Sequence, residues 1–175
     1  MKRRLLRSGL VLIPVVVFLV NYGLFQQPMD QVLERDQRNE GMTVRAHWRW
    51  YVDPTVLVYD LRSASADTKG IDVLRAFLQF AYRQKDRHFG RVVLAWQGVP
   101  RFYVNGPDFS ELGRQYAKRS PIDTMVVIPS VVYRMDGSRP FPVPAGQAWL
   151  DQQQKQLLDF NRFINAWAAA QVQPQ

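Results

Sequence analysis

The sequence predicts an α+β fold: a small antiparallel sheet with two helices between its strands and a long C-terminal helix, preceded by an N-terminal transmembrane helix. Three observations support this prediction. Short alternating or β-branched runs, bounded by Gly, Pro and Asp, predict strands. Apolar residues three and four positions apart predict helices. A long apolar stretch behind a basic patch predicts a membrane segment.

The N-terminal segment has the features of a signal anchor. A basic patch (Lys2, Arg3, Arg4 and Arg7) precedes an apolar stretch at residues 9–25. The length of this stretch falls within the ~17–25 residues that span a bilayer. The flank behind it lacks the pair of small residues that a signal peptidase needs. We therefore expect the anchor to remain attached to the chain.

This interpretation predicts four regions along the chain. Residues 1–8 form a cytoplasmic basic N-terminus, 9–25 the anchor, 26–42 a polar juxtamembrane stalk, and 43–175 an exported domain. Because basic residues stay on the cytoplasmic side, the protein is expected as a single-pass protein of a bacterial inner membrane, with its C-terminal domain in the periplasm. The alternative is a cleaved signal and a secreted domain.

The composition limits the chemistry of the domain. The formal net charge is +8, but four of these charges belong to the basic patch, so the chain does not carry the charge signature of a nucleic-acid-binding protein. No cysteine is present, which excludes thiol catalysis, Cys-ligated zinc and haem attachment. We expect no cofactor and no metal.

Two strands and a helix are predicted in the first half of the domain. Residues 43–52 alternate, with Val44, Ala46, Trp48 and Trp50 on one side, as in a half-buried strand. Residues 55–61 are apolar and β-branched and predict the next strand. Between residues 71 and 82, apolar side chains recur at helical spacing and predict a helix that ends before Gly90.

The second half begins with a predicted antiparallel hairpin formed by residues 91–96 and 101–104. Pro107 is suited to the first turn of a following helix. The β-rich run at 124–128 is assigned to a strand, although a capping-box pattern begins at Ser120. Residues 145–170 are predicted to form the long C-terminal helix.

No catalytic motif is recognisable. His47 and His88 have no metal-binding spacing, and no serine lies in a G-x-S-x-G context. The start of the helix near residues 105–108 is interpreted as a turn rather than an anion site. A hydrolase of unrecognised type stays open as an alternative. It predicts a pocket that gathers some of five side chains: His47, Asp53, Asp60, Asp108 and Glu111.

Two surface features are candidates for binding. The first is a possible anionic-ligand face of Arg45, His47 and Arg49, flanked by aromatic residues; the alternative is that these side chains are simply solvated. The second is a possible partner-helix face on the C-terminal helix, for which core packing is the alternative. Its residues are Phe160, Phe163, Ile164 and Trp167.

These features favour a membrane-anchored extracytoplasmic interaction module, as a small accessory subunit of a cell-envelope assembly. The expected partners are the membrane, through residues 9–25, and a protein; nucleic acid is not expected. The alternatives are the unrecognised hydrolase and a domain that binds anionic lipid or glycan.

Overall fold

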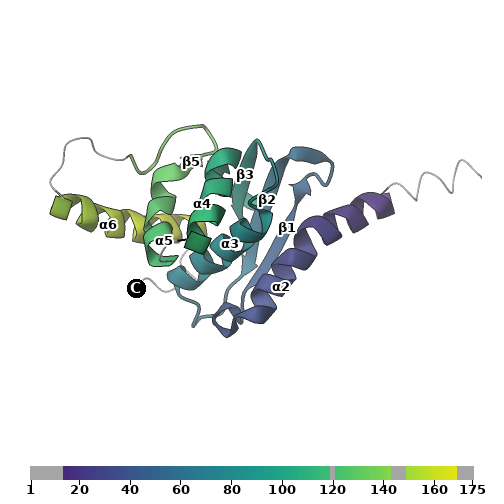
Figure 1. Cartoon of the computed structure of the whole chain (residues 1–175), viewed down its shortest axis with the longest axis horizontal. Helices are drawn as coiled ribbons and strands as arrows, with labels where there is room; N and C mark the ends of the chain where they lie inside the picture. The colour runs from purple at the N-terminus through teal and green to yellow at the C-terminus, as the bar shows by residue number, and fades with distance from the viewer. Residues whose placement is uncertain (1–13, 119–120, 143–148, 169–175) are drawn as a thin grey trace, which may run out of the picture.

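The computed structural model describes residues 14–118, 121–142 and 149–168, with side chains from 154 onward in the last range. Within these ranges the chain forms one five-stranded sheet with helices packed on it (Figure 1). The strands lie in chain order and are β1 (Thr43–Arg49), β2 (Asp53–Ser63), β3 (Arg91–Trp96), β4 (Val99–Asn105) and β5 (Val132–Arg134).

The sheet is mixed, which corrects the predicted antiparallel sheet. β2 and β3 run parallel, whereas the other three neighbouring pairs are antiparallel. The reason is α3 (Gly70–Gln84), which carries the chain from the end of β2 back to the opposite end of the sheet. A crossover helix of this kind joins parallel strands, so the fold is a mixed α/β fold.

The described helices cover one face of the sheet. They include α3, α4 (Gly106–Lys118), α5 (Pro121–Val131) and α6 (Trp149–Ala168). Tyr59 on β2 packs against Phe77 of α3 and Trp167 of α6, with ring centroids 5.2 and 5.8 Å away. Phe102 on β4 lies 5.3 Å from Phe163 of α6. The rings of both helices therefore meet the same face of the sheet.

Several predicted elements are confirmed. The helix at 71–82 lies inside α3, the hairpin of 91–96 and 101–104 is β3–β4, and the helix near Pro107 is α4. The strand predicted at 124–128 is wrong, because these residues belong to α5. Thr124, Met125 and Ile128 are buried, and their spacing is helical, so tertiary packing overrides the β propensity of the run.

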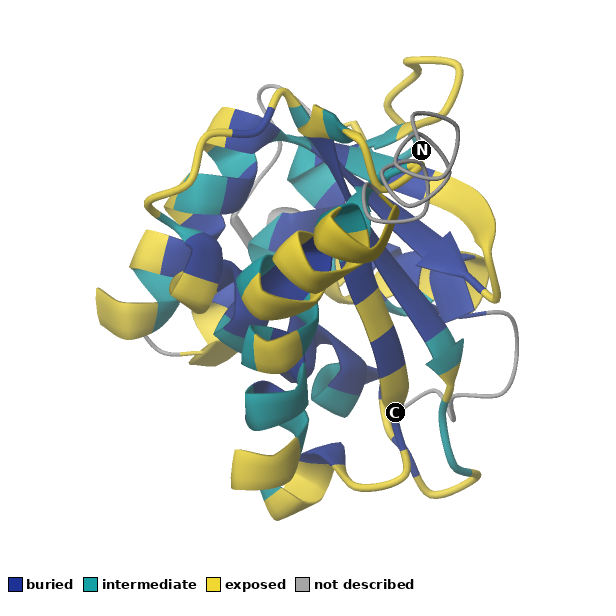
Figure 2. Cartoon of the chain, turned by 90° about the vertical axis from the view of Figure 1, so that its right-hand side faces the viewer, coloured by how far each residue is buried: buried dark blue, intermediate teal, exposed yellow. Residues whose placement is uncertain are grey.

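The N-terminal helix is part of the domain rather than a separate anchor and stalk. Helical backbone runs without a break from residue 14 through η1 (Tyr22–Gln26) into α2 (Gln27–Arg35). Phe25 and Met29 are fully buried in the same core as the sheet, and Val32 is 4 % exposed. Figure 2 shows this helix with a buried inner side and an exposed outer side. Residues assigned to the end of the anchor and to the stalk thus fill the core.

The predicted transmembrane helix is corrected by this structure. In the described ranges, no helix has the length and apolar character needed to cross a membrane. The single-pass inner-membrane placement that depended on it is therefore not supported. The physical reason is that the last residues of the predicted span, including Asn21 and Phe25, are buried against β1 and the core. The predicted cytoplasmic segment 1–8 lies outside the described residues.

Candidate functional site

The face of the sheet opposite the helices is the candidate site. The strand register places one row of side chains across all five strands on this face, namely His47, Val58, Val93, Tyr103 and Tyr133. Directly paired residues in neighbouring strands point to the same side of a sheet. The row therefore forms a continuous surface that begins at β1 and ends at β5. We call it the cross-strand row.

The floor of this face is apolar. Val56 and Val93 are 4 % exposed and Ala95 is 1 % exposed, yet none of the three belongs to the hydrophobic cluster that the helices cover. Tyr103 and Tyr133 stack on each other at one end of the row, with their ring centroids 5.2 Å apart. The contact area that this face offers therefore comes mainly from the partly exposed tyrosines, which lie beside a buried apolar floor.

Arginines surround this floor. Arg45 and Arg91 stand beside the cross-strand row by register, and no ion pair involves either of them within the described ranges. The guanidinium of Arg91 lies 5.5 Å from the ring centroid of Tyr103. The guanidinium of Arg139 lies 4.8 Å from the ring centroid of Tyr133. The two tyrosine rings therefore hold cations at the β4–β5 end of the face.

Asp60 is the carboxylate that the register places among these arginines. Its side chain is almost fully buried; Oδ2 accepts a hydrogen bond from Arg62 at 2.9 Å, and Oδ1 accepts one from the backbone N–H of Gly98 at 2.9 Å. Gly98 has a φ of +83° in the β3–β4 turn, a conformation suited to glycine. Because Asp60 is engaged by Arg62 and the turn, it forms no ion pair with Arg45 or Arg91. On the sheet itself, the arginines of this face therefore outnumber its carboxylate.

The predicted anionic-ligand face is brought together only in part. Arg45 and His47 lie on the uncovered face, but a register shift between Trp48 and Arg49 interrupts the alternation of β1. Arg49 instead pairs with Asp53 at 2.7 Å. Its guanidinium also lies 4.5 Å from the ring centroid of Trp50. A β-bulge at a strand end commonly redirects one side chain in this way.

His47 is held in a fixed orientation at the β1 end of the row. Its ring stacks on Tyr51 with centroids 4.5 Å apart. Nδ1 lies 2.7 Å from the backbone oxygen of Trp48. A carbonyl oxygen only accepts hydrogen bonds, so Nδ1 carries the proton and Nε2 is the acceptor when the ring is neutral.

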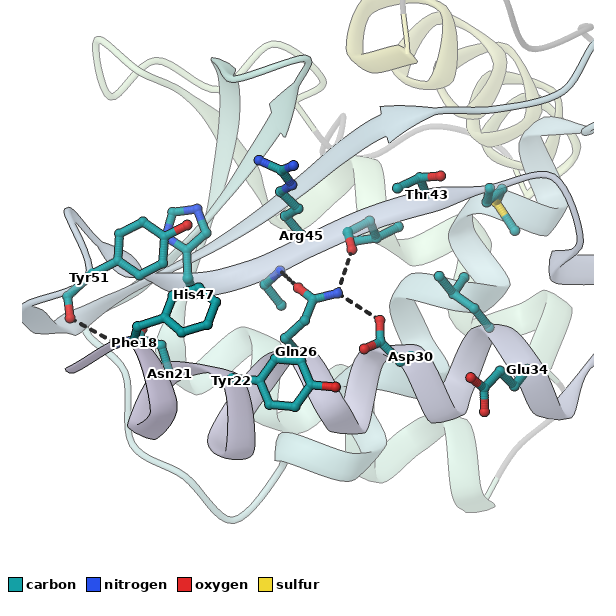
Figure 3. Close-up of a pocket in the computed structure, with 14 residues that line it drawn as sticks. Phe18, Asn21, Tyr22, Gln26, Asp30, Glu34, Thr43, Arg45, His47 and Tyr51 are labelled. Carbon is teal, nitrogen blue, oxygen red and sulfur yellow. Dashed lines mark hydrogen bonds between the residues drawn. The ribbon is translucent and has the colours of Figure 1, made fainter. Parts of the chain in front are cut away.

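Beside β1 the uncovered face continues into a groove of about 600 Å³ (Figure 3). The helix side of the groove carries Tyr22, Asp30 and Glu34, and the strand side carries Arg45 and His47. The groove therefore has carboxylates on one wall and basic side chains on the other. It widens the binding surface beyond the edge of the sheet.

Two amides of the N-terminal helix occupy the open edge of β1 inside this groove. The Gln26 side chain accepts a hydrogen bond from Ala46 N at 2.9 Å and donates one to Val44 O at 3.0 Å. Asn21 accepts one from Trp48 N at 2.8 Å. These amides replace the backbone of a neighbouring strand. Covering an edge in this way prevents strand addition, so a partner of β1 must use side-chain contacts.

The predicted partner-helix face of α6 lies in the core instead of at the surface. All four side chains are buried: Phe160, Phe163, Ile164 and Trp167. Trp167 Nε1 also donates a hydrogen bond to Ala95 O at 3.1 Å. Ala95 is paired with Pro100, which has no N–H, so the indole supplies a donor that the strand lacks. In this fold the four residues serve the packing of α6.

The carboxylates considered for hydrolysis are dispersed. Asp60 lies in the middle of the sheet, Asp53 follows the β1–β2 turn, and Glu111 pairs with Arg114 on α4 at 3.1 Å. None of these, nor Asp108, lines the groove that contains His47. Within the residues that the structure describes, no three His, Cys, Asp or Glu side chains form a possible metal site. The geometry brings binding residues together and leaves the acid–base candidates apart.

Sequence reasoning missed Arg91, Tyr103, Tyr133 and Arg139 as members of the site. Alternation in residues 91–104 indicates that Arg91 and Tyr103 share a hairpin face, but the neighbouring strands and their register do not follow from that pattern.

No family model matches this chain, and no curated protein or solved structure shows significant similarity to it.

Proposed function

We propose that this chain is a protein-binding module whose uncovered sheet face receives an extended, acidic segment of a partner protein. The observation that carries the proposal is the cross-strand row itself, an apolar and aromatic floor bordered by arginines whose charges Asp60 does not offset. Arginine and tyrosine are enriched in protein interfaces. In a segment that alternates acidic and apolar residues, the acidic side chains can pair with the arginines and the apolar ones can contact the tyrosines.

The dimensions of the face suit such a segment. The row crosses five strands, and at ~4.8 Å between neighbours it spans about 19 Å. About six residues of extended chain, at ~3.3 Å each, cover that distance.

The part of the N-terminal helix around residues 15–19 adds a further reason to favour a protein partner. Near the groove, Phe18 is 57 % exposed, and Val15, Val16 and Leu19 are also exposed. Several exposed apolar side chains close together in the chain are typical of interaction sites. A small anion would not use it.

The test is fluorescence anisotropy with a labelled peptide of six to ten residues in which glutamate alternates with tyrosine. We expect saturable binding to the full chain at 50 mM salt and weaker binding at 300 mM, because the attraction is partly screened. Arg45→Glu and Arg91→Glu should each weaken binding about fivefold or more, which corresponds to ~1 kcal/mol.

Arg162→Glu is the matched control, since Arg162 is exposed on α6 in the helical layer. This variant carries the same charge change and should bind the peptide as the parent chain does. Equal losses for all three variants would show that only net charge matters. Absence of binding at 50 mM salt would reject the proposal, and stronger binding of a sulfated glycan than of the peptide would favour the glycan alternative.

A further inference from the structure

A second hollow, of about 770 Å³, lies in the helical layer on the other side of the sheet from the cross-strand row. It is formed by the end of α2, the short η2 helix (Gln37–Asn39), the second half of α3, and α4. Four basic side chains line it, namely Arg35, Arg38, Arg83 and Lys85, together with one carboxylate, Asp36. We call it the basic pocket. Its volume is within the range of small-molecule sites.

Asp36 is fully engaged by its neighbours. Its two oxygens accept hydrogen bonds from Arg38 Nε at 2.9 Å and Nη2 at 2.8 Å, and Gln79 Nε2 donates to it at 3.0 Å. The hydrogen bonds from Arg38 hold the pKa of Asp36 well below its usual value. Asp36 also pairs with the buried Arg75, whose Nε lies 3.5 Å from Oδ2. The carboxylate is therefore shared by two guanidinium groups and does not neutralise Arg35, Arg83 or Lys85.

The other three basic side chains of the pocket have weak partners or none within the described residues. Arg83 donates a hydrogen bond to the neutral Oε1 of Gln31 at 3.0 Å. Lys85 pairs with Asp86, whose side chain is 82 % exposed, and such an exposed pair contributes little. In the described ranges no ion pair involves Arg35. Like charges around one hollow repel each other, and an anion between them would relieve that repulsion.

The wall of the basic pocket is held in place by buried hydrogen bonds. Asn39 is 1 % exposed, and its Nδ2 donates to Val32 O at 3.0 Å and to Gln79 Oε1 at 2.8 Å. Gln79 in turn holds Asp36. These contacts tie α2, η2 and α3 to one another. The helices that carry the basic side chains are thus held in place before a ligand binds, and only the exposed arginine side chains need to be ordered.

We infer that the basic pocket binds a small ligand that carries two or more linked phosphate groups. Guanidinium groups recognise phosphate through paired, charge-assisted hydrogen bonds. Arg35 on α2 and Arg83 on α3 approach the hollow from two helices and can contact different phosphates of one chain. Tyr82 and Tyr116 also line the hollow. This site is independent of the proposed peptide surface.

The test is isothermal titration calorimetry of the full chain with inorganic tripolyphosphate and, separately, with ATP. We expect saturable binding of tripolyphosphate at 50 mM salt, and a loss of about tenfold or more in affinity for Arg35→Gln and for Arg83→Gln. Arg162→Gln is the control and should leave the affinity unchanged. If ATP binds more tightly than tripolyphosphate, the tyrosines contact the nucleoside; equal affinities mean that the phosphate chain alone is recognised.

Two results would overturn the inference: no heat of binding with tripolyphosphate at 50 mM salt, or equal weakening in all three variants. Arg35 and Arg83 are exposed, so their substitution should not disturb folding, and circular dichroism checks this. The acidic-peptide assay separates the two proposals. Arg35→Gln should leave peptide binding unchanged, and Arg91→Glu should leave tripolyphosphate binding unchanged.

Discussion

Replacing Gln26 by glutamate should destabilise the fold strongly although the two side chains have nearly the same shape. Gln26 Nε2 donates to Val44 O at 3.0 Å and to Asp30 Oδ1 at 2.7 Å, while Oε1 accepts from Ala46 N at 2.9 Å. A carboxylate keeps the acceptor and loses the donor. It also places a negative charge against two oxygens that now lack their hydrogen bonds.

The magnitude follows from these contacts. Leaving a partly buried acceptor without its donor costs ~1–3 kcal/mol, and the carbonyl and the carboxylate are both affected. We therefore expect Gln26→Glu to lower the free energy of unfolding by about 3 kcal/mol at pH 7. At ~2–4 °C per kcal/mol for a chain of this size, the melting temperature should fall by about 6–12 °C.

Urea unfolding monitored by tryptophan fluorescence measures this effect, with Gln27→Glu as the control. Gln27 is the next residue along the helix and is exposed, so the same chemical change should cost less than about 0.5 kcal/mol there. The deficit of Gln26→Glu should shrink as the pH falls towards 4, because the protonated carboxyl group can donate again. Equal stability of the two variants would refute the edge-covering role of Gln26.

Two further predictions concern buried polar groups. The Tyr59 hydroxyl is completely buried and has no hydrogen-bond partner within the described structure, and burial raises the pKa of Tyr59. Tyr59→Phe should therefore leave the free energy of unfolding, measured in urea, unchanged or raise it by up to ~1 kcal/mol. A loss above ~1 kcal/mol would reveal an unrecognised partner of the hydroxyl group. Asp36→Asn should cost about 2 kcal/mol at pH 7, since the hydrogen bonds from Arg38 lower the pKa of Asp36. This contribution is present above the unfolded pKa near 3.8 and is lost as the pH falls through the lower folded value. The difference in unfolding free energy between the parent chain and Asp36→Asn should therefore be smaller at pH 2.5 than at pH 7. The control Asp86→Asn, at an exposed carboxylate, should change the unfolding free energy little at either pH.

The role of the N-terminal helix in the fold explains why its polar residues were difficult to interpret from the sequence. Asn21 lies inside the apolar stretch 9–25 and Gln26 directly follows it, a pattern that resembles the end of a membrane anchor. In the structure both amides serve β1, and Phe25 between them fills the core. Hydrophobicity alone does not distinguish an apolar residue that packs on a sheet from one that faces lipid. The distinction depends on a strand that lies about twenty residues further along the chain.

In the candidate site, too, some features follow from local sequence patterns and others depend on residues distant in the chain. Alternation along β1 correctly placed Arg45 and His47 on a common side, because period two is a local property of a strand. The bulge that removes Arg49 from that side depends on the turn to β2 and on Asp53. The remaining members, Arg91 and Tyr103 among them, join the site only through pairing across the sheet. Local patterns do not specify such pairing.

The sequence by itself determined the elements with strong local periodicity: the strand beginning at residue 43, the helix of 71–82 and the hairpin of 91–104. It also determined that no thiol chemistry is available, because the chain has no cysteine. Only the tertiary structure decided the parallel pairing of β2 with β3, the helical state of residues 124–128 and the inclusion of residues 21–35 in the domain. The physical reason is that each of these depends on burial against residues distant in sequence, and such contacts outweigh local propensity.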